Sequence, residues 1–172
     1  MPGGHVPFTA VAIDVDGDVQ LTPVRGKASS LEQLTTMFHL AVVVLDPFTY
    51  ESSWIIDTGR RIMSVYSEAD CRVGFIVTGT VDEAKQFMGP LVNEYLVLAD
   101  PHRHAVKAMG LERLPAFVHL NQNHAIETKA EGWNPDEWRA VAERLTVLMD
   151  WRRPQIPTAN DPVPFEGTPA LG

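Results

Sequence analysis

Apolar residues follow two different spacings along this chain, and the spacing predicts where strands and helices lie. Residues 40–45 form an uninterrupted apolar run, which predicts a strand buried on both faces, because a strand with one face in water would alternate apolar and polar residues. Residues 138–149 instead repeat apolar side chains every three or four positions, the spacing of a helix that packs one face against a sheet. Asn134, Pro135 and Glu137 before them fill the positions of a helix start. The sequence therefore predicts a central strand and a long C-terminal helix.

Shorter elements are predicted between these two. Ser30 with Gln33, and Thr80 with Glu83, have the spacing of a capping box, in which side chain and backbone bond reciprocally at the start of a helix. The pair Asp16-Gly17 lies within alternating apolar residues and predicts a hairpin turn. The other predicted elements are a hairpin over 8–22 around that turn, a helix to about residue 66 after the central strand, strands at 73–77 and 96–99, a short helix from 100 to 110, and a hairpin over 116–128.

The stretch 96–126 carries the most specific pattern. Pro115 opens an apolar strand, Leu-Pro-Ala-Phe-Val, although proline cannot donate to a sheet ladder and is confined to strand starts, edges and bulges. A helix that ends in glycine, followed by such a proline and an apolar strand pair, resembles the thioredoxin-like superfamily, in which that proline is cis. The resemblance covers residues 8–151. It implies an α/β fold with a mixed central sheet flanked by helices, here with an N-terminal β-hairpin extension and a proline-rich C-terminal tail.

In the thioredoxin-like superfamily, including its peroxiredoxin-type members, the helix after the central strand begins with the active-site cysteines. The resemblance places Thr49-Tyr50-Glu51-Ser52 at the Cys-x-x-Cys position, so hydroxyl side chains stand where both thiols would be. The single cysteine, Cys71, follows this helix beside the strand at 73–77. A chain with one cysteine forms no internal disulfide and cannot run a dithiol redox cycle by itself.

Bulk properties limit the classes of function. The 172 residues are 45% hydrophobic and 21% charged, which suits one globular domain. The net charge of −8 argues against a nucleic-acid partner, which would need clustered Lys and Arg. No apolar run approaches the ~20 residues that span a bilayer, and residues 1–5 lack the features of a secretion signal. We therefore expect no nucleic-acid or membrane partner and a cytoplasmic location.

Three segments are expected along the chain. Residues 1–7 are expected to be disordered, and residues 8–151 to form the thioredoxin-like domain. Residues 152–172 contain few side chains able to build a core, which predicts a flexible or extended tail. Its prolines are Pro154, Pro157, Pro162, Pro164 and Pro169.

The favoured function is a redox-inactive protein-binding or chaperone-like module. Thioredoxin-like domains hold an extended peptide beside the cis-proline, a local form of strand addition that needs no cysteine. We expect a protein or peptide partner, with a homodimer left open, and no catalytic residue, cofactor or metal. Trp54 is a further candidate for an aromatic contact. The resemblance implies a peptide-binding groove formed by Phe48, Thr49, Tyr50, Ser52, Leu114 and Pro115.

Two enzyme classes remain as alternatives. A thiol oxidoreductase or peroxidase-like enzyme would use Cys71 alone, although a lone cysteine beside a core strand is more often a small buried apolar residue. A magnesium-dependent phosphatase is the other, because residues 11–19 resemble the first motif of the haloacid-dehalogenase family, with Asp14 as nucleophile and Asp16 as general acid. Residues 75–79 resemble the second motif of that family, and residues 98–100, which end in Asp100, resemble part of the fourth. Asp18 stands where that family usually has threonine. An ordinary Asp-Gly turn explains the same residues.

Overall fold

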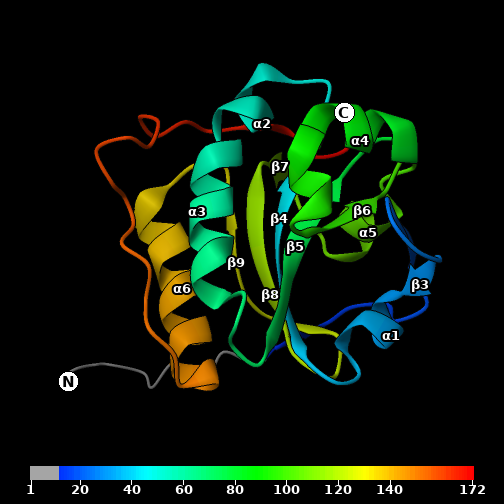
Figure 1. The fold of residues 1–172 in the computed structure, drawn as a ribbon, viewed down its shortest axis with the longest axis horizontal. Helices are drawn as coiled ribbons and strands as arrows, with labels where there is room; N and C mark the ends of the chain where they lie inside the picture. Colours follow the sequence, from blue (N-terminus) through cyan, green and yellow to red (C-terminus); the bar gives the residue numbers. More distant parts are fainter. Residues whose placement is uncertain (1–11) are drawn as a thin grey trace.

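The computed structural model describes residues 12–172 (Figure 1). The segment 1–7 and the first part of the hairpin expected at 8–22 lie outside the described residues. The strands are β1 (Ile13–Asp14), β2 (Gln20–Pro23), β3 (Ser29–Ser30), β4 (His39–Leu45), β5 (Cys71–Val77), β6 (Leu96–Ala99), β7 (Arg113–Leu114), β8 (Ala116–Leu120), β9 (Ala125–Glu131) and β10 (Thr168–Pro169). The helices are α1 (Leu31–Thr35), α2 (Tyr50–Trp54), α3 (Ile56–Tyr66), α4 (Val81–Met88), the 3-10 helix η1 (Gly89–Asn93), α5 (His104–Ala108) and α6 (Pro135–Met149).

A mixed eight-stranded sheet forms the centre of the molecule, in the order β1-β9-β8-β4-β5-β6-β2-β3. Strand β4 runs parallel to β5 and antiparallel to β8, and every one of its residues after His39 is buried. The prediction of a central strand at 40–45 is confirmed. Because neighbouring side chains on a strand point to opposite faces, β4 contributes to two separate cores.

Helices cover both faces of this sheet, as the sequence predicts (Figure 1). On one face, Ala41, Val43 and Leu45 of β4 belong to a core with α3, α4 and α6. On the other face, Leu40, Val42 and Val44 belong to a core with α1 and α5. Strand β4 thus lies between two packed layers, and its carboxyl end lies at one edge of the molecule.

Predictions that depend on local capping are confirmed. Both bonds of the capping box form at Ser30 and again at Thr80, and Asn134 accepts hydrogen bonds from two backbone N–H groups in the first turn of α6. The short helix predicted from residue 100 begins later, at His104. The carboxylate of Asp100 is the reason, because it accepts from backbone N–H groups inside α5 and holds the intervening residues in a turn.

Two further predictions need correction. The single helix predicted to run to residue 66 is broken at Ile55, which ends α2 and begins α3. The strands on either side of Asp16-Gly17 do not pair with each other as a hairpin: β1 pairs with β9, whereas β2 pairs with β6 and β3. The N-terminal hairpin of the described chain is β2-β3. The turn therefore carries the chain from one edge of the sheet toward the other.

The proline-rich tail has an extended course over the surface. It runs upward beside α6 and α3 and then crosses the end of the sheet near α2 and β7, where it is drawn in red (Figure 1). There β10 pairs antiparallel with β7 in a small second sheet. None of the helices within residues 12–172 is long and apolar enough to cross a membrane.

Candidate functional site

The predicted site begins where β4 ends, at a turn organised by Asp46. The Oδ1 of Asp46 accepts a hydrogen bond from the Phe48 N–H at 2.9 Å, and its backbone carbonyl accepts one from the Thr49 N–H at 3.3 Å. The backbone N–H of Asp46 donates to Ser52 Oγ at 2.9 Å. These bonds fix the start of α2 against the end of the central strand.

Both hydroxyl side chains at the expected cysteine positions are bonded to the backbone of this turn. Ser52 is fully buried, and its Oγ accepts the bond from Asp46. Thr49 Oγ1 donates to the Asp46 carbonyl at 3.3 Å. The two side chains therefore hold the loop in place, and neither oxygen has the low-pKa thiol chemistry that the family's cysteines supply.

Leu114 and Pro115 reach the same end of the sheet through the strand beside β4. Val44 lies opposite Ala116 in the β4-β8 ladder, so one step further along the antiparallel register brings Pro115 level with the last residue of β4. The Leu114-Pro115 peptide bond is cis, and Leu114 is fully buried. The carbonyl of Pro115 accepts from the Gly132 N–H at 2.8 Å. The structure thus brings both predicted halves of the groove to one end of the sheet.

The C-terminal tail lies along this end. Thr168 in β10 pairs with Leu114, and its Oγ1 donates to the Leu114 carbonyl at 3.3 Å. Phe165 exchanges two backbone bonds with Trp133: its N–H donates at 3.1 Å and its carbonyl accepts at 2.8 Å. The backbone edge beside Pro115 is therefore already paired with the chain's own tail.

Arg103 joins the tail to the turn after β4. Its Nη2 donates to Asp46 Oδ2 at 3.0 Å and its Nη1 donates to the Ala170 carbonyl at 2.7 Å. Arg103 has φ of 59° at the start of α5, a left-handed conformation. The side chains of this ion pair are largely buried, where a charge pair is screened little by solvent. Sequence reasoning did not find Asp46, Arg103 or Ala170, because nothing near them along the chain indicates that they meet.

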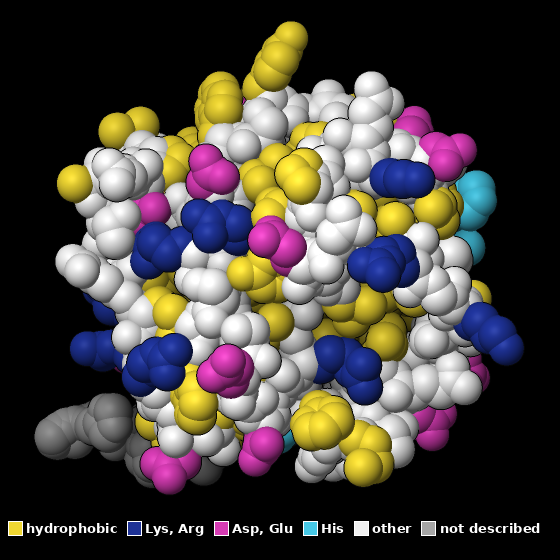
Figure 2. Space-filling model, in the orientation of Figure 1, with side chains coloured by type: hydrophobic (Ala, Val, Ile, Leu, Met, Phe, Trp, Pro, Cys, Tyr) yellow, Lys and Arg dark blue, Asp and Glu magenta, His cyan; other side chains and the backbone are white. Residues whose placement is uncertain are grey.

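Three aromatic side chains surround the turn and remain exposed. Phe48 is 63% exposed, Tyr50 is 81% exposed and Trp54 is 55% exposed. The Trp54 ring makes an edge-to-face contact with Phe165 of the tail, with ring centroids 5.5 Å apart. Figure 2 shows apolar side chains projecting from this end of the molecule, above α2. Aromatic residues are enriched at protein interfaces relative to the rest of the protein surface.

Cys71 lies at the other end of the sheet. It is the first residue of β5 and pairs with His39, the first residue of β4, so the strand rise places it about 20 Å from the turn at Asp46. The thiol is buried, and burial, followed by the neighbouring charge of Asp70, raises its pKa to about 12. Cys71 is therefore outside the predicted groove and protonated at neutral pH.

The structure also separates the residues of the phosphatase motif. Asp14 is in the edge strand β1, four strands from β5 in the sheet order, which is about 19 Å at the usual strand spacing. Asp100, at the end of β6, caps α5 through its carboxylate. Within residues 12–172, no group of three or more His, Cys, Asp or Glu side chains is arranged to hold a metal ion. The geometry does not assemble the magnesium site that this alternative requires.

A histidine pair was also missed by sequence reasoning. His39 and His119 sit side by side on β4 and β8, with Nδ1 of His39 2.9 Å from Nε2 of His119. His119 is fully buried, and burial, with smaller effects of His39 and Arg144, lowers its pKa to about 3, against the opposing effect of Glu127. The antiparallel register of β4 and β8 brings His39 and His119 together, although they are far apart in the sequence.

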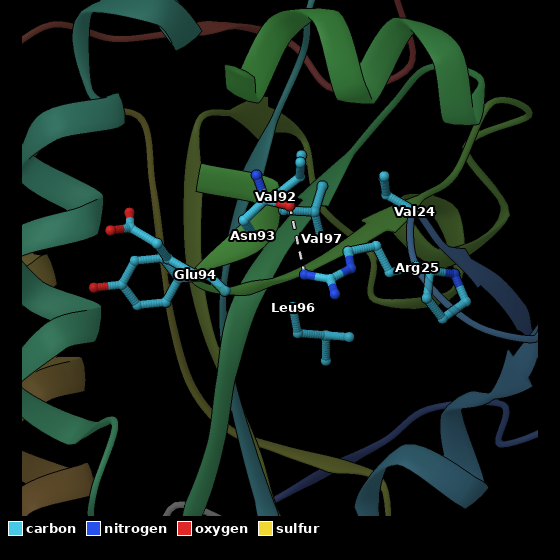
Figure 3. A pocket seen from close by; sticks show the side chains of 9 residues that line it. Val24, Arg25, Val92, Asn93, Glu94, Leu96 and Val97 are labelled. Atoms are coloured by element: carbon cyan, nitrogen blue, oxygen red, sulfur yellow. Dashed lines mark hydrogen bonds between the residues drawn. The ribbon is translucent and has the colours of Figure 1, made fainter. Parts of the chain in front are cut away.

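One surface hollow lies away from the predicted site (Figure 3). It has a volume of about 320 Å³ and lies between the end of β2 and the segment from η1 to β6. Figure 3 shows Arg25 reaching across it toward Asn93, with Arg25 Nη1 3.5 Å from Asn93 Oδ1. The hollow includes none of the six residues predicted for the groove.

Comparison with solved structures identifies the architecture. A thiol:disulfide interchange protein of the DsbE type, described as putative, from Chlorobium tepidum superposes with a TM-score of 0.64 at 14% identity, covering 80% of this chain and 97% of that one. A hypothetical protein from Sinorhizobium meliloti has a TM-score of 0.66 at 14% identity, covering 93% of each chain. Peroxiredoxin Q from Xanthomonas campestris has a TM-score of 0.62 at 10% identity, covering 79% and 94%. The chain has a thioredoxin-like fold.

Comparison of structures finds relatives of this thioredoxin-like fold, whereas comparison of sequences does not. No family model matches the chain, and no curated protein matches it. At identities of 14% and below the solved structures establish the fold alone. The function of this thioredoxin-like chain must therefore be argued from its own residues.

Proposed function

We propose that this protein is a redox-inactive, chaperone-like binding module that holds an extended segment of another protein at the carboxyl end of β4. The groove would consist of Phe48, Thr49, Tyr50, Ser52, Leu114 and Pro115, the residues expected from the sequence. We also propose that the protein is cytoplasmic. A second copy of this chain, forming a homodimer, is the secondary candidate for the partner.

One observation carries this proposal: the backbone edge at Leu114 accepts an extended strand, which in this structure is the chain's own segment around Thr168. A strand edge recognises main-chain groups, which supply affinity, and the side chains around it set the preference for particular sequences. The exposed rings of Phe48 and Tyr50 supply the side-chain contacts that such binding needs, since aromatic residues dominate the energy of many interfaces. The hydroxyls of Thr49 and Ser52, already bonded to the backbone, support a site without thiol chemistry.

The proposal is tested by photo-crosslinking in cells. A benzophenone side chain at Tyr50 is expected to capture a discrete protein, and the additional substitution Phe48→Ala is expected to reduce that capture about tenfold or more, as for a central interface residue. The same probe at Val147, which is 72% exposed on α6, is the matched control. Equal capture from Val147, or capture unaffected by Phe48→Ala, would contradict the proposed surface.

The single-cysteine enzyme remains the second candidate, because the structural neighbours include peroxiredoxin Q. Its test is the reactivity of Cys71. Since burial raises the pKa of this thiol from 9.0 to about 12, we expect Ellman's reagent at about pH 8 to react with the native protein about a thousandfold more slowly than with the unfolded chain.

An exposed thiol made by Ser53→Cys is the positive control, because Ser53 lies on the open side of α2. It is expected to react at once while Cys71 stays protected. Rapid reaction of Cys71 in the native wild-type protein would instead favour the peroxidase-like enzyme over the binding module.

A further inference from the structure

The last residues of the chain form a complete strand ligand for the edge at Leu114. Beyond the Thr168-Leu114 pair, the Ala170 N–H donates to the Glu112 carbonyl at 2.9 Å, and Phe165 bonds to Trp133 through both of its backbone groups. The segment 165–170 therefore satisfies main-chain groups of both β7 and the loop after β9.

Side chains of this segment fit defined places in the domain. The Phe165 ring contacts the edge of the exposed Trp54. Ala170 is only 1% exposed and packs in the core layer that contains Leu114 and Ala116. Arg103 binds the Ala170 carbonyl. An aromatic residue, and a small residue five positions later, are thus the two side chains of the tail that have defined positions against the domain.

Gly167, which lies between these two side chains, permits the tail backbone to approach Leu114 and Gly132 closely. Gly167 has φ of +89°, and a Cβ at this position would lie 2.6 Å from the Leu114 carbonyl oxygen and 3.2 Å from Gly132 Cα. Gly132 has φ of +70°, and its own Cβ would overlap the Glu166 carbonyl. A side chain at either position would push the strand away from the edge.

The segment is fixed at its beginning by the buried side chain of Asp161, and beyond Asp161 it is held mainly by hydrogen bonds. Asp161 accepts hydrogen bonds at 2.8 Å from Thr58 Oγ1 and from Arg61 Nη2, and its side chain is 4% exposed. After Asp161, Ala170 is the only buried residue. A segment with so little buried apolar surface is expected to open locally at much lower cost than global unfolding. Asp161 would therefore stay in place as an anchor if residues 162–172 left the edge.

We propose that residues 165–170 act as an intramolecular competitor, called the guard below, that occupies the binding edge. The partner is then an extended segment of like chemistry: an aromatic residue, glycine two positions later, and a small residue five positions later. The identity of the site as a partner-binding groove rests on the proposed function. Replacement of the guard by a synthetic peptide can be measured without that partner. Tethering at Asp161 gives the guard an effective concentration on the order of millimolar, so free segments bind well only after it has left.

The test uses full-length chains and a fluorescent synthetic peptide of residues 161–172. Ala170→Asp places a charge in the apolar layer and is expected to release the guard, whereas Leu171→Asp alters an exposed neighbour, 55% exposed, and is the control. We expect the peptide to bind Ala170→Asp about tenfold or more tightly than wild type or Leu171→Asp, since the internal competitor is gone. Hydrogen exchange at the Trp133 N–H, which Phe165 protects, is expected to rise in the same variant.

A second pair of variants separates release from misfolding. Gly167→Ala should release the guard through its contact with the Leu114 carbonyl. Gly89→Ala also changes a glycine with positive φ but meets nothing within 4 Å, so any general effect of the substitution appears there too. Unchanged exchange at β4 amides shows that the core stays folded. If neither Ala170→Asp nor Gly167→Ala binds the peptide more tightly than its control, the guard is refuted.

The recognition rule is tested on the peptide itself. Phe165→Ala and Gly167→Val in the peptide are each expected to weaken binding to the Ala170→Asp protein about tenfold, whereas Val163→Ala should have no effect because Val163 is 82% exposed in the tail. Equal binding by all three peptides would overturn the rule. A wild-type dimer that dissociates on Ala170→Asp would mean that the tail pairs between copies, which would also overturn an internal guard.

The guard and the proposed function fail in different experiments. Crosslinking from Tyr50 measures the partner, and peptide binding measures the guard. If Tyr50 captures its partner but Ala170→Asp does not increase that capture, the function stands and the guard is rejected. If the peptide binds the released edge but Tyr50 captures nothing, the guard stands and the partner-binding proposal fails.

Discussion

Replacing Trp138 by alanine is expected to lower the free energy of unfolding by about 3 to 5 kcal/mol, the cost of removing a large aromatic side chain from a core. Trp138 is fully buried in α6, where its ring contacts Phe117 and, edge to face, Trp133. Its indole N–H donates to the Gly132 carbonyl at 2.7 Å. The substitution therefore removes both packing and the support of the loop on which the tail rests. Chemical denaturation followed by circular dichroism measures the change.

Trp138→Phe separates the two contributions. It keeps an aromatic ring against Phe117 but leaves the Gly132 carbonyl without its donor, and we expect a smaller loss of about 1 to 3 kcal/mol. Exchange at the Trp133 N–H, next to Gly132, should increase in both variants. A Trp138→Ala protein as stable as wild type would show that α6 does not support the core as described.

Acid is expected to destabilise the fold through His119. An ordinary histidine has a pKa near 6.5, whereas burial lowers the pKa of His119 to about 3 in the folded protein. The folded state thus favours the neutral ring, so this contribution to stability is complete above about pH 6.5 and is lost as the pH falls toward 3. Between about pH 7 and pH 4.5 the expected loss is about 2 to 3 kcal/mol, at 1.36 kcal/mol per pKa unit. The pKa of His39 is also lowered by burial and changes stability in the same direction.

The check is the slope of stability against pH, not stability at one pH. The groups facing His119 are His39 on β4, Glu127 on β9 and Arg144 on α6. His119→Leu is expected to flatten the slope in this range, because the variant has no buried ring to protonate. Phe117→Leu, on the same strand, lowers stability without removing a titratable group and should retain the wild-type slope. An unchanged slope in His119→Leu would contradict the assignment.

Features set by neighbours in sequence could be predicted. The capping boxes at Ser30 and Thr80 depend on residues three positions apart, and the buried strand β4 depends on its own apolar run. The thioredoxin-like fold was expected from the family resemblance that these elements and the Leu-Pro strand carry. The break at Ile55 was missed, because the apolar residues on its two sides continue at helical spacing and nothing in the sequence interrupts them.

Features set by distant residues could not be predicted. Arg103 and Asp46 are 57 positions apart, and Thr168 and Leu114 are 54 positions apart. Their contacts depend on where the sheet places each element, which no local spacing encodes. The proline content of the tail predicts that it contributes few residues to the core, and it does not predict that the tail packs against the domain. The groove residues were named from the family resemblance, and the tail beside them became visible only in three dimensions.

The proline in β10 has a consequence for self-association. Strand β10 is an edge strand of its two-stranded sheet. Pro169 within it is exposed and has no N–H to offer to an incoming chain. Natural sheets use proline in this way to prevent edge-to-edge growth. While the tail is paired with β7, this end of the molecule therefore resists aggregation. Release of the tail, as proposed above, would uncover the edge at Leu114, where aggregates would begin.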